Sequence, residues 1–130
     1  MSRRTRQVAS AIREELADIV RREINDPRIE TVGFVTISEV QISPDHRDGL
    51  VWVAFMGKEE KSREVQDALA ALNSSSGYIH KLLVKRIPVK ALPRLRFKFD
   101  RGFDRAAEID LAFRKIDGRG APRSGSGEEE

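Results

Sequence analysis

The chain has 130 residues, of which 35% are charged and 39% hydrophobic, a balance typical of one globular domain with a polar terminal segment. It contains no cysteine, which excludes a disulfide framework and a thiolate metal site, and no run approaches the ~20 apolar residues of a membrane span. The N-terminus lacks the apolar core of a secretory signal, so we expect a cytoplasmic protein with no membrane partner.

Residues 3–24 predict the first helix, and the Asn25-Asp26-Pro27 sequence ends it because the residue before a proline avoids helical angles. The helix has an apolar stripe at three- and four-residue spacing, formed by Val8, Ile12, Leu16, Ile19 and Val20. Its start is basic, and two interpretations of that charge remain equally favoured, solvation and contact with phosphate: Arg3, Arg4 and Arg6.

Two strands follow, at residues 32–43 and 50–56, joined by a polar turn at 44–49. In the first strand the apolar residues change from odd to even positions, so we expect a β-bulge near Ser38 and Glu39. The second strand has no polar residue, which indicates a central position in the sheet.

A pair of helices is predicted next, the first opening at residues 57–61 and the second ending near Ile87 and Pro88. Both have apolar residues at helical spacing, and between them lies Ser75-Ser76-Gly77. Serine favours caps and glycine is unfavourable inside a helix, so we expect a kink with a serine cap and with Gly77 at an angle that alanine resists. For this stretch alone, a plain packing turn is the simpler explanation.

The last strand is predicted at residues 94–100, where Leu95, Phe97 and Phe99 alternate with basic residues. A short helix is expected over residues 103–116, and the Gly, Ser, Pro and charged residues 117–130 predict a disordered tail. The domain therefore spans residues 1–116. With a right-handed parallel crossover through the helix pair, the fold class is α+β, in the order α-β-β-α-kink-α-β. It has a three-stranded mixed sheet, the second strand central and the helices on one face.

Charge is segregated along the chain. Residues 79–101 carry eight Lys or Arg and one Asp, a charge of +7, whereas the whole chain carries +3, so the rest sums to −4. This segregation indicates a nucleic-acid surface, although for any single cation solvation is the commoner role. The candidate RNA-binding residues are Arg3, Arg4, Arg6, Ser75, Ser76, Gly77, His80, Lys81, Lys85, Arg86, Lys90, Arg94, Arg96 and Lys98.

The element order and four segments together resemble ribosome-binding factor A, a bacterial small-subunit maturation factor with a KH-like fold of the second type. The segments are REINDPR at 22–28, VTIS at 35–38, SSGYIHKLL at 75–83 and PRLRFKFD at 93–100. The helix pair lacks the GxxG loop with which KH domains clamp RNA. The family has an Ala-x-Gly kink there, and this chain departs from it at Ser75.

The resemblance implies a non-catalytic factor that binds the immature small (30S) ribosomal subunit and its rRNA and assists 16S rRNA maturation. No motif of an enzyme or a metal site is present, and His46 and His80 stand alone. We expect a monomer with neither cofactor nor small-molecule substrate. The alternative is a free-standing KH-like module for single-stranded RNA, which the missing GxxG loop and the 6% aromatic content disfavour. Only Trp52 and Tyr78 remain as stacking candidates.

Overall fold

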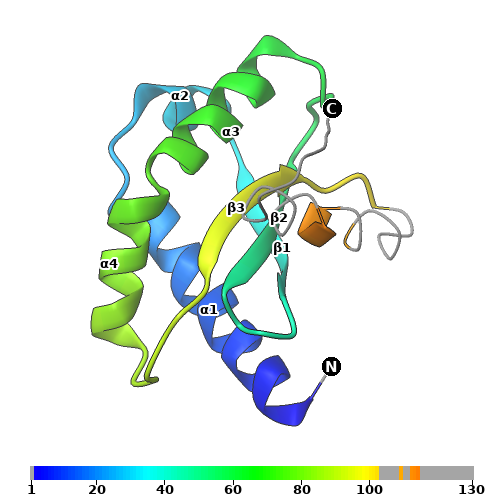
Figure 1. The fold of residues 1–130 in the computed structure, drawn as a ribbon. Coiled ribbons are helices and arrows are strands. Elements are labelled where there is room, and N and C mark those ends of the chain that lie inside the picture. The colour runs from blue at the N-terminus through cyan, green and yellow to red at the C-terminus, as the bar shows by residue number, and fades with distance from the viewer. Residues whose placement is uncertain (1, 103–108, 110–111, 115–130) are drawn as a thin grey trace, which may run out of the picture.

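A computed structural model describes residues 2–102, 109 and 112–114 (Figure 1). The elements follow in the order α1 (Arg3–Arg22), α2 (Pro27–Thr31), β1 (Val35–Ile42), β2 (Asp48–Phe55), α3 (Arg63–Ser74), α4 (Ser76–Arg86) and β3 (Arg94–Phe99). The sheet order is β1-β2-β3, with β1 and β2 antiparallel and β2 and β3 parallel. The predicted α+β class, the mixed sheet and the central second strand are confirmed.

The bulge expected in the first strand is confirmed as well, because the register with β2 shifts between Ile37 and Glu39. Before the shift Ile37 lies opposite Val53, and after it Val40 lies opposite Val51. All four of these side chains are buried in one core. The bulge therefore keeps both halves of β1 facing the helices, in spite of the change from odd to even positions.

Helix α1 packs its apolar stripe against the sheet, with Ile12, Leu16 and Ile19 fully buried. It ends at Arg22, earlier than predicted, and a short helix that the sequence analysis missed follows it. Asp26 caps α2 by accepting a hydrogen bond from the Arg28 backbone N–H at 2.9 Å, and Pro27 is its first residue. Asp-Pro ends one helix here and begins another, since proline is well suited to a first helical turn.

The helix pair differs from the prediction in three respects. Helix α3 begins at Arg63 rather than within 57–61, because Ser62 supplies the cap by accepting from the Val65 backbone N–H at 3.3 Å. The predicted break between the helices is confirmed and falls at Ser75, but the side chain of Ser75 makes no capping bond. Gly77 lies inside α4 without a positive φ, and nothing lies within 4 Å of an added Cβ. The expected serine cap and the strained glycine angle are therefore both wrong.

The two faces of the sheet carry separate apolar clusters. Helices α1, α3 and α4 cover one face, where Val51 and Val53 are buried. On the other face Leu50 and Trp52 are fully buried against Ala112, with Ile109 and Phe113 packed around them. These C-terminal residues are helical, as expected, and lie beside the strands on the side away from α4 (Figure 1). The remainder of that expected helix and the predicted tail at 117–130 lie outside the described residues.

Candidate nucleic-acid interface

The basic side chains of β3 lie on the sheet face that the long helices leave open. Leu95 and Phe97 are buried in the helix-facing core, so the alternating Arg94, Arg96 and Lys98 point to the opposite face. There Arg96 lies beside Leu50 of β2, and Lys98 lies beside Trp52. Arg94 and Arg96 are exposed, and Lys98 is half-buried.

The basic residues of α4 occupy a different surface. Lys81 and Lys85 are exposed and one helical turn apart, on a helix that covers the other face of the sheet. Lys90 is exposed in the connector that leads to β3. The site predicted as one surface is therefore divided between two faces that meet at the β3 edge.

Arg86 is engaged in an ion-pair cluster between α4 and α1. Its guanidinium donates to the carboxylates of Asp18 at 2.8 Å, Glu15 at 3.2 Å and Glu23 at 3.4 Å. The hydrogen bond from Arg86 is the largest cause that holds the pKa of Asp18 below its ordinary value, and the pKa of Arg86 is raised in turn. This cation fastens two helices together, so we remove it from the proposed RNA-contacting set.

The other candidates at the helix pair have mainly local roles. His80 Nε2 lies 3.2 Å from the Leu92 carbonyl oxygen and ties α4 to the connector before β3. Because a carbonyl only accepts, this nitrogen carries the proton. Ser75 and Ser76 are half-buried, and Gly77 is exposed. Ser75, Ser76 and Gly77 carry no basic group, so they determine the geometry of the break between the helices and add no positive charge there.

The N-terminal arginines lie near the start of β3. The sequence did not predict that these two segments are close together. Thr5 Oγ1 lies 2.7 Å from both Ser2 Oγ and His46 Nε2, which joins the first turn of α1 to the β1–β2 turn. That turn is in turn bonded to β3, since the Arg94 backbone N–H donates to the Arg47 carbonyl at 2.9 Å.

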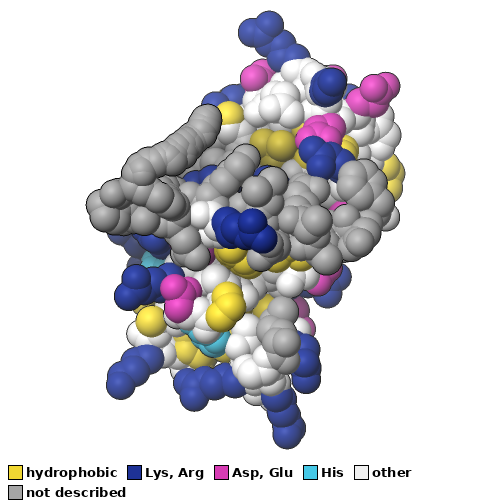
Figure 2. All heavy atoms as spheres, turned by 45° about the vertical axis from the view of Figure 1, so that its right-hand side comes forward, with side chains coloured by type: hydrophobic (Ala, Val, Ile, Leu, Met, Phe, Trp, Pro, Cys, Tyr) yellow, Lys and Arg dark blue, Asp and Glu magenta, His cyan; other side chains and the backbone are white. Residues whose placement is uncertain are grey.

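These links bring together exposed cations from three segments, which we call the cationic end: Arg3, Arg4, Arg6, Arg47 and Arg94. Figure 2 shows several Lys and Arg side chains around the lower end of the face it presents. Arg47 was missed because a single arginine in a polar turn has no distinguishing pattern. The Thr5–His46 contact, 41 residues apart, places it beside the N-terminal arginines, and its carbonyl bonds to Arg94.

The start of α1 departs from the usual electrostatics of helices. Anions stabilise a helix N-terminus because the backbone N–H groups there carry partial positive charge. The first turn of α1 has no acid, and the cations Arg3, Arg4 and Arg6 stand in or beside it. This arrangement opposes the helix dipole in the free protein, and a bound anion would relieve it.

Within the described part of the chain, no helix is long and apolar enough to cross a membrane. The same residues contain no group of three or more His, Cys, Asp or Glu that could hold a metal ion. Exposed cations at the cationic end and on α4 and β3 are the groups on the described surface that suit an anionic partner.

Sequence comparisons agree with this fold. The family model described as Ribosome-binding factor A matches residues 4–113. A relative of that name from Halorhodospira halophila is 41% identical over 113 residues, covering 87% of this chain and 86% of the relative. One from Nitrosococcus oceani is 37% identical over 116 residues, covering 86% and 87% of the two chains.

Solved structures give the same result. The solution NMR structure of a Thermotoga maritima protein, provisionally named a ribosome binding factor A, is similar with a TM-score of 0.65 and 29% identity, covering 80% of this chain and 93% of that one. A homology model of the Thermus thermophilus ribosome binding factor A, fitted into a cryo-EM map of its complex with the 30S subunit, has a TM-score of 0.55 and 26% identity. It covers 80% of this chain and 99% of that one.

Proposed function

Because this chain belongs to the ribosome-binding factor A family, we propose that it binds the small ribosomal subunit through the subunit's RNA. In this proposal it acts in the cytoplasm as a monomer and a non-catalytic factor that assists 16S rRNA maturation. The observation that carries the RNA contact is the cationic end. There Arg3, Arg4 and Arg6 oppose the dipole of their own helix, a local cost that phosphate would offset.

The RNA-contacting set follows from the geometry above. It keeps the predicted cations other than Arg86, which the acids of α1 engage, and it gains Arg47. Its members are Arg3, Arg4, Arg6, Arg47, Lys81, Lys85, Lys90, Arg94, Arg96 and Lys98. Phosphates can be contacted by cations on two faces if RNA passes along the β3 edge or around the cationic end. Such contacts hold the protein in place and carry no sequence information, which suits a partner recognised by its shape.

A module for single-stranded RNA fits less well. Such modules stack bases on exposed aromatic rings. Trp52, on the open face of the sheet, is fully buried against Ala112. Tyr78, which is 50% exposed, lies on α4 rather than on the sheet. The ring at the centre of this sheet face is thus covered, and the exposed Phe34 lies at the end of β1, away from the cations of β3.

The test compares three pair variants, each of which removes two exposed cations. They are Arg3→Ala with Arg4→Ala, Lys81→Ala with Lys85→Ala, and the matched control Lys61→Ala with Arg63→Ala at the start of α3, where Arg63 is 93% exposed. Affinity for purified small subunits is measured across salt concentrations. Each lost phosphate contact should reduce the slope of log affinity against log salt by about one.

We expect the N-terminal and α4 pairs each to lower affinity and to reduce the slope by about two, and the control pair to change neither appreciably. Equal losses in all three variants would show that net charge alone matters, which would contradict the assigned surface. No binding of the unaltered protein to small subunits would overturn the function itself. Native circular dichroism of each variant is the control for folding.

A further inference from the structure

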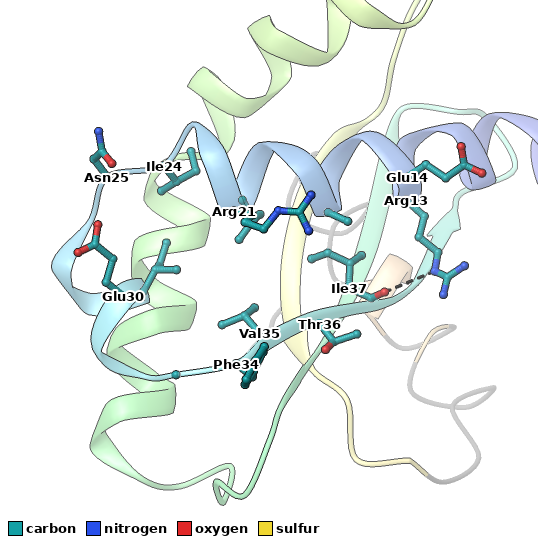
Figure 3. A pocket seen from close by; sticks show the side chains of 14 residues that line it. Arg13, Glu14, Arg21, Ile24, Asn25, Glu30, Phe34, Val35, Thr36 and Ile37 are labelled. Atoms are coloured by element: carbon teal, nitrogen blue, oxygen red, sulfur yellow. Dashed lines mark hydrogen bonds between the residues drawn. The ribbon is translucent and has the colours of Figure 1, made fainter.

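A groove of about 610 Å³ lies between the C-terminal half of α1, α2 and the outer edge of β1 (Figure 3). Its apolar lining includes Val20 from α1, Ile24 from the turn that follows α1, Ile29 from α2, and Val35 and Ile37 from β1. The rim carries Arg13, Glu14, Arg21 and Glu30. The balance of two cations and two acids distinguishes this groove from the phosphate-binding surface proposed above.

The backbone of β1 turns some of its N–H and C=O groups away from β2 and toward this groove. The Met56 backbone N–H donates to the Phe34 carbonyl at 3.3 Å, so Phe34 bonds toward β2. Successive residues of a strand point their backbone groups to alternate sides, which turns those of Val35 and Ile37 outward. Arg13 supports this, because its Nε lies 3.4 Å from the Ile37 carbonyl, on the side away from β2.

The two edges of the sheet are treated differently. On β3, the outward N–H and C=O of Phe97 are both bonded to the side chain of Asn73, at 2.8 Å and 3.1 Å. On β1, the outward carbonyl of Ile37 accepts a long hydrogen bond from Arg13. The outward N–H and C=O of Val35 have no bonded partner within the described chain. An edge strand with free backbone groups is a template for another strand. Strand addition is an established mode of peptide recognition.

Side chains on both sides of this edge could receive an added strand. Phe34 and Met56 lie opposite each other at the end of β1 and β2 and are 75% and 74% exposed. Alternate residues of an incoming segment would reach these two on one face and Val20 and Ile24 in the groove on the other. The occupant is therefore an extended polypeptide with apolar residues at alternate positions.

The rim charges define the occupant further. Arg21 is paired with Asp18 at 3.5 Å, and Arg13 is turned toward β1. Glu14 and Glu30, at opposite ends of the groove in Figure 3, make no ion pair within the described residues. Arg13 likewise has no carboxylate partner among the described residues, so the rim charges without an ion pair are two acids and one cation. This excess of one acid favours a basic segment over RNA.

We propose that the β1 edge binds an extended, basic segment of a small-subunit protein, which adds to the sheet as a fourth strand. This inference rests on the proposed function for the source of the segment. The chain's own residues 117–130 are a poor occupant, because they are rich in Gly, Ser and Glu and contain no alternating apolar residues. A second copy of the chain, paired edge to edge, is an outcome that the test distinguishes.

The first measurement is hydrogen exchange by mass spectrometry, on the full chain alone and bound to purified small subunits. We expect fast exchange in peptides covering residues 33–37 of the free chain and at least tenfold slower exchange in the complex. Protection already present in the free chain would show that the edge is filled by the chain itself. Binding without added protection at 33–37 would overturn the inference and leave the proposed function intact.

The second measurement uses Val35→Pro, which removes an outward N–H that the chain's own sheet does not use, at the first position of the strand where proline is tolerated. Its matched control, Val35→Thr, keeps the shape and the N–H. We expect the proline variant to lower subunit affinity about tenfold, the cost of one lost hydrogen bond and a steric clash, and the threonine variant to lower it less than threefold.

If the proline variant does not fold, as judged by circular dichroism, the exchange measurement alone decides. Sedimentation of the free chain gives the remaining outcome. A dimer that Val35→Pro dissociates would assign the edge to a second copy and overturn the small-subunit partner.

Discussion

The carboxamide of Asn73 takes the place of a neighbouring strand along the outer edge of β3. Its Oδ1 accepts from the Phe97 backbone N–H at 2.8 Å, and its Nδ2 donates to the carbonyls of Phe97 and Leu69, both at 3.1 Å. The side chain of Asn73 thereby joins the last turn of α3 to the sheet. At the next residue, the hydroxyl of Ser74 donates back to the Ala71 carbonyl at 3.0 Å. Such back-bonding bends helices, which accounts for a break at Ser75 rather than at Gly77.

Asn73→Ala should lower the free energy of unfolding by about 1–3 kcal/mol, because it leaves the N–H of the buried Phe97 without its partner. Urea denaturation at pH 7 measures the effect. Asn73→Asp keeps the acceptor but places a carboxylate against two carbonyl oxygens, so it should be at least as destabilising. A loss below about 0.5 kcal/mol in both variants would mean that water satisfies this edge equally well.

Gly77→Ala should raise the free energy of unfolding by about 0.5–1 kcal/mol, the reverse of what the sequence alone predicts. Gly77 is helical, and an added Cβ meets nothing within 4 Å, so alanine gains helix propensity without a clash. The matched control is Gly57→Ala, since Gly57 has equal space but a φ of +72°, where alanine is strained. Thermal denaturation of the two variants should give shifts of opposite sign. A lowered melting temperature for Gly77→Ala would instead support the strained glycine angle that the sequence predicted.

At the scale of elements, the ion-pair cluster around Arg86 connects α4 to α1. The pKa of Asp18 lies below its ordinary value of 3.8, chiefly through the hydrogen bond from Arg86. A carboxyl group with a lowered folded-state pKa stabilises the fold fully above its unfolded pKa, and this contribution disappears as pH falls through the folded pKa. The link between the two helices is therefore strong at neutral pH and weakens below pH 4.

Asp18→Asn should be destabilising at pH 7, and the difference from the unaltered chain should shrink steadily as pH is lowered from about 5 toward 2. Urea denaturation across that range measures it. Asp67→Asn is the control, because its pair with Arg63 spans 3.9 Å and Arg63 is 93% exposed, so little change is expected at any pH. A pH-independent loss for Asp18→Asn would assign its role to packing rather than to charge.

The elements that the sequence predicted well are those with a strong period. The alternation in β3 and the apolar run in β2 located both strands, and the phase change in β1 located the bulge. Helix α2 was missed because five residues are too few to show a helical period. A cap by Asp26 with proline in the next position was the available signal.

The candidate site was predicted less well than the fold, because charge shows which residues are basic but not what they contact. Arg86 and Lys85 are neighbours in sequence, yet one meets three carboxylates of α1 and the other is exposed. Arg47 joins the N-terminal arginines only through a contact that spans 41 residues. Side-chain partners distant in sequence leave no local pattern, so both facts required the structure.

At the scale of the whole molecule, the sheet separates three surfaces with different chemistry. One face is filled by the long helices, and the other holds Leu50 and Trp52 beside the cations of β3. The β1 edge opens into an apolar groove whose rim carries both acids and cations. RNA and a protein segment could thus be bound at the same time, without competing for side chains.

The described C-terminal residues complete the second face, which a pair of truncations tests. Trp52 is the single tryptophan and is fully buried against Ala112, Ile109 and Phe113. A chain ending at residue 102 should expose it, which shifts its fluorescence to longer wavelength and lowers the melting temperature. Among the described residues, the helix-facing core contains none beyond Phe99, so the unfolding followed by far-ultraviolet circular dichroism should remain cooperative on heating.

A chain ending at residue 116 is the matched control and should keep the native emission, because residues 117–130 offer no apolar face. Those residues carry two arginines and four acids, so their removal raises the net charge from +3 to +5. Its affinity for small subunits at low salt should therefore rise slightly, and the gain should vanish as salt screens the charge. If the chain ending at residue 102 fails to fold, the Trp52 emission of Phe113→Ala in the full chain decides the question. Unchanged Trp52 emission in that variant would mean that the C-terminal residues do not cover this face in solution.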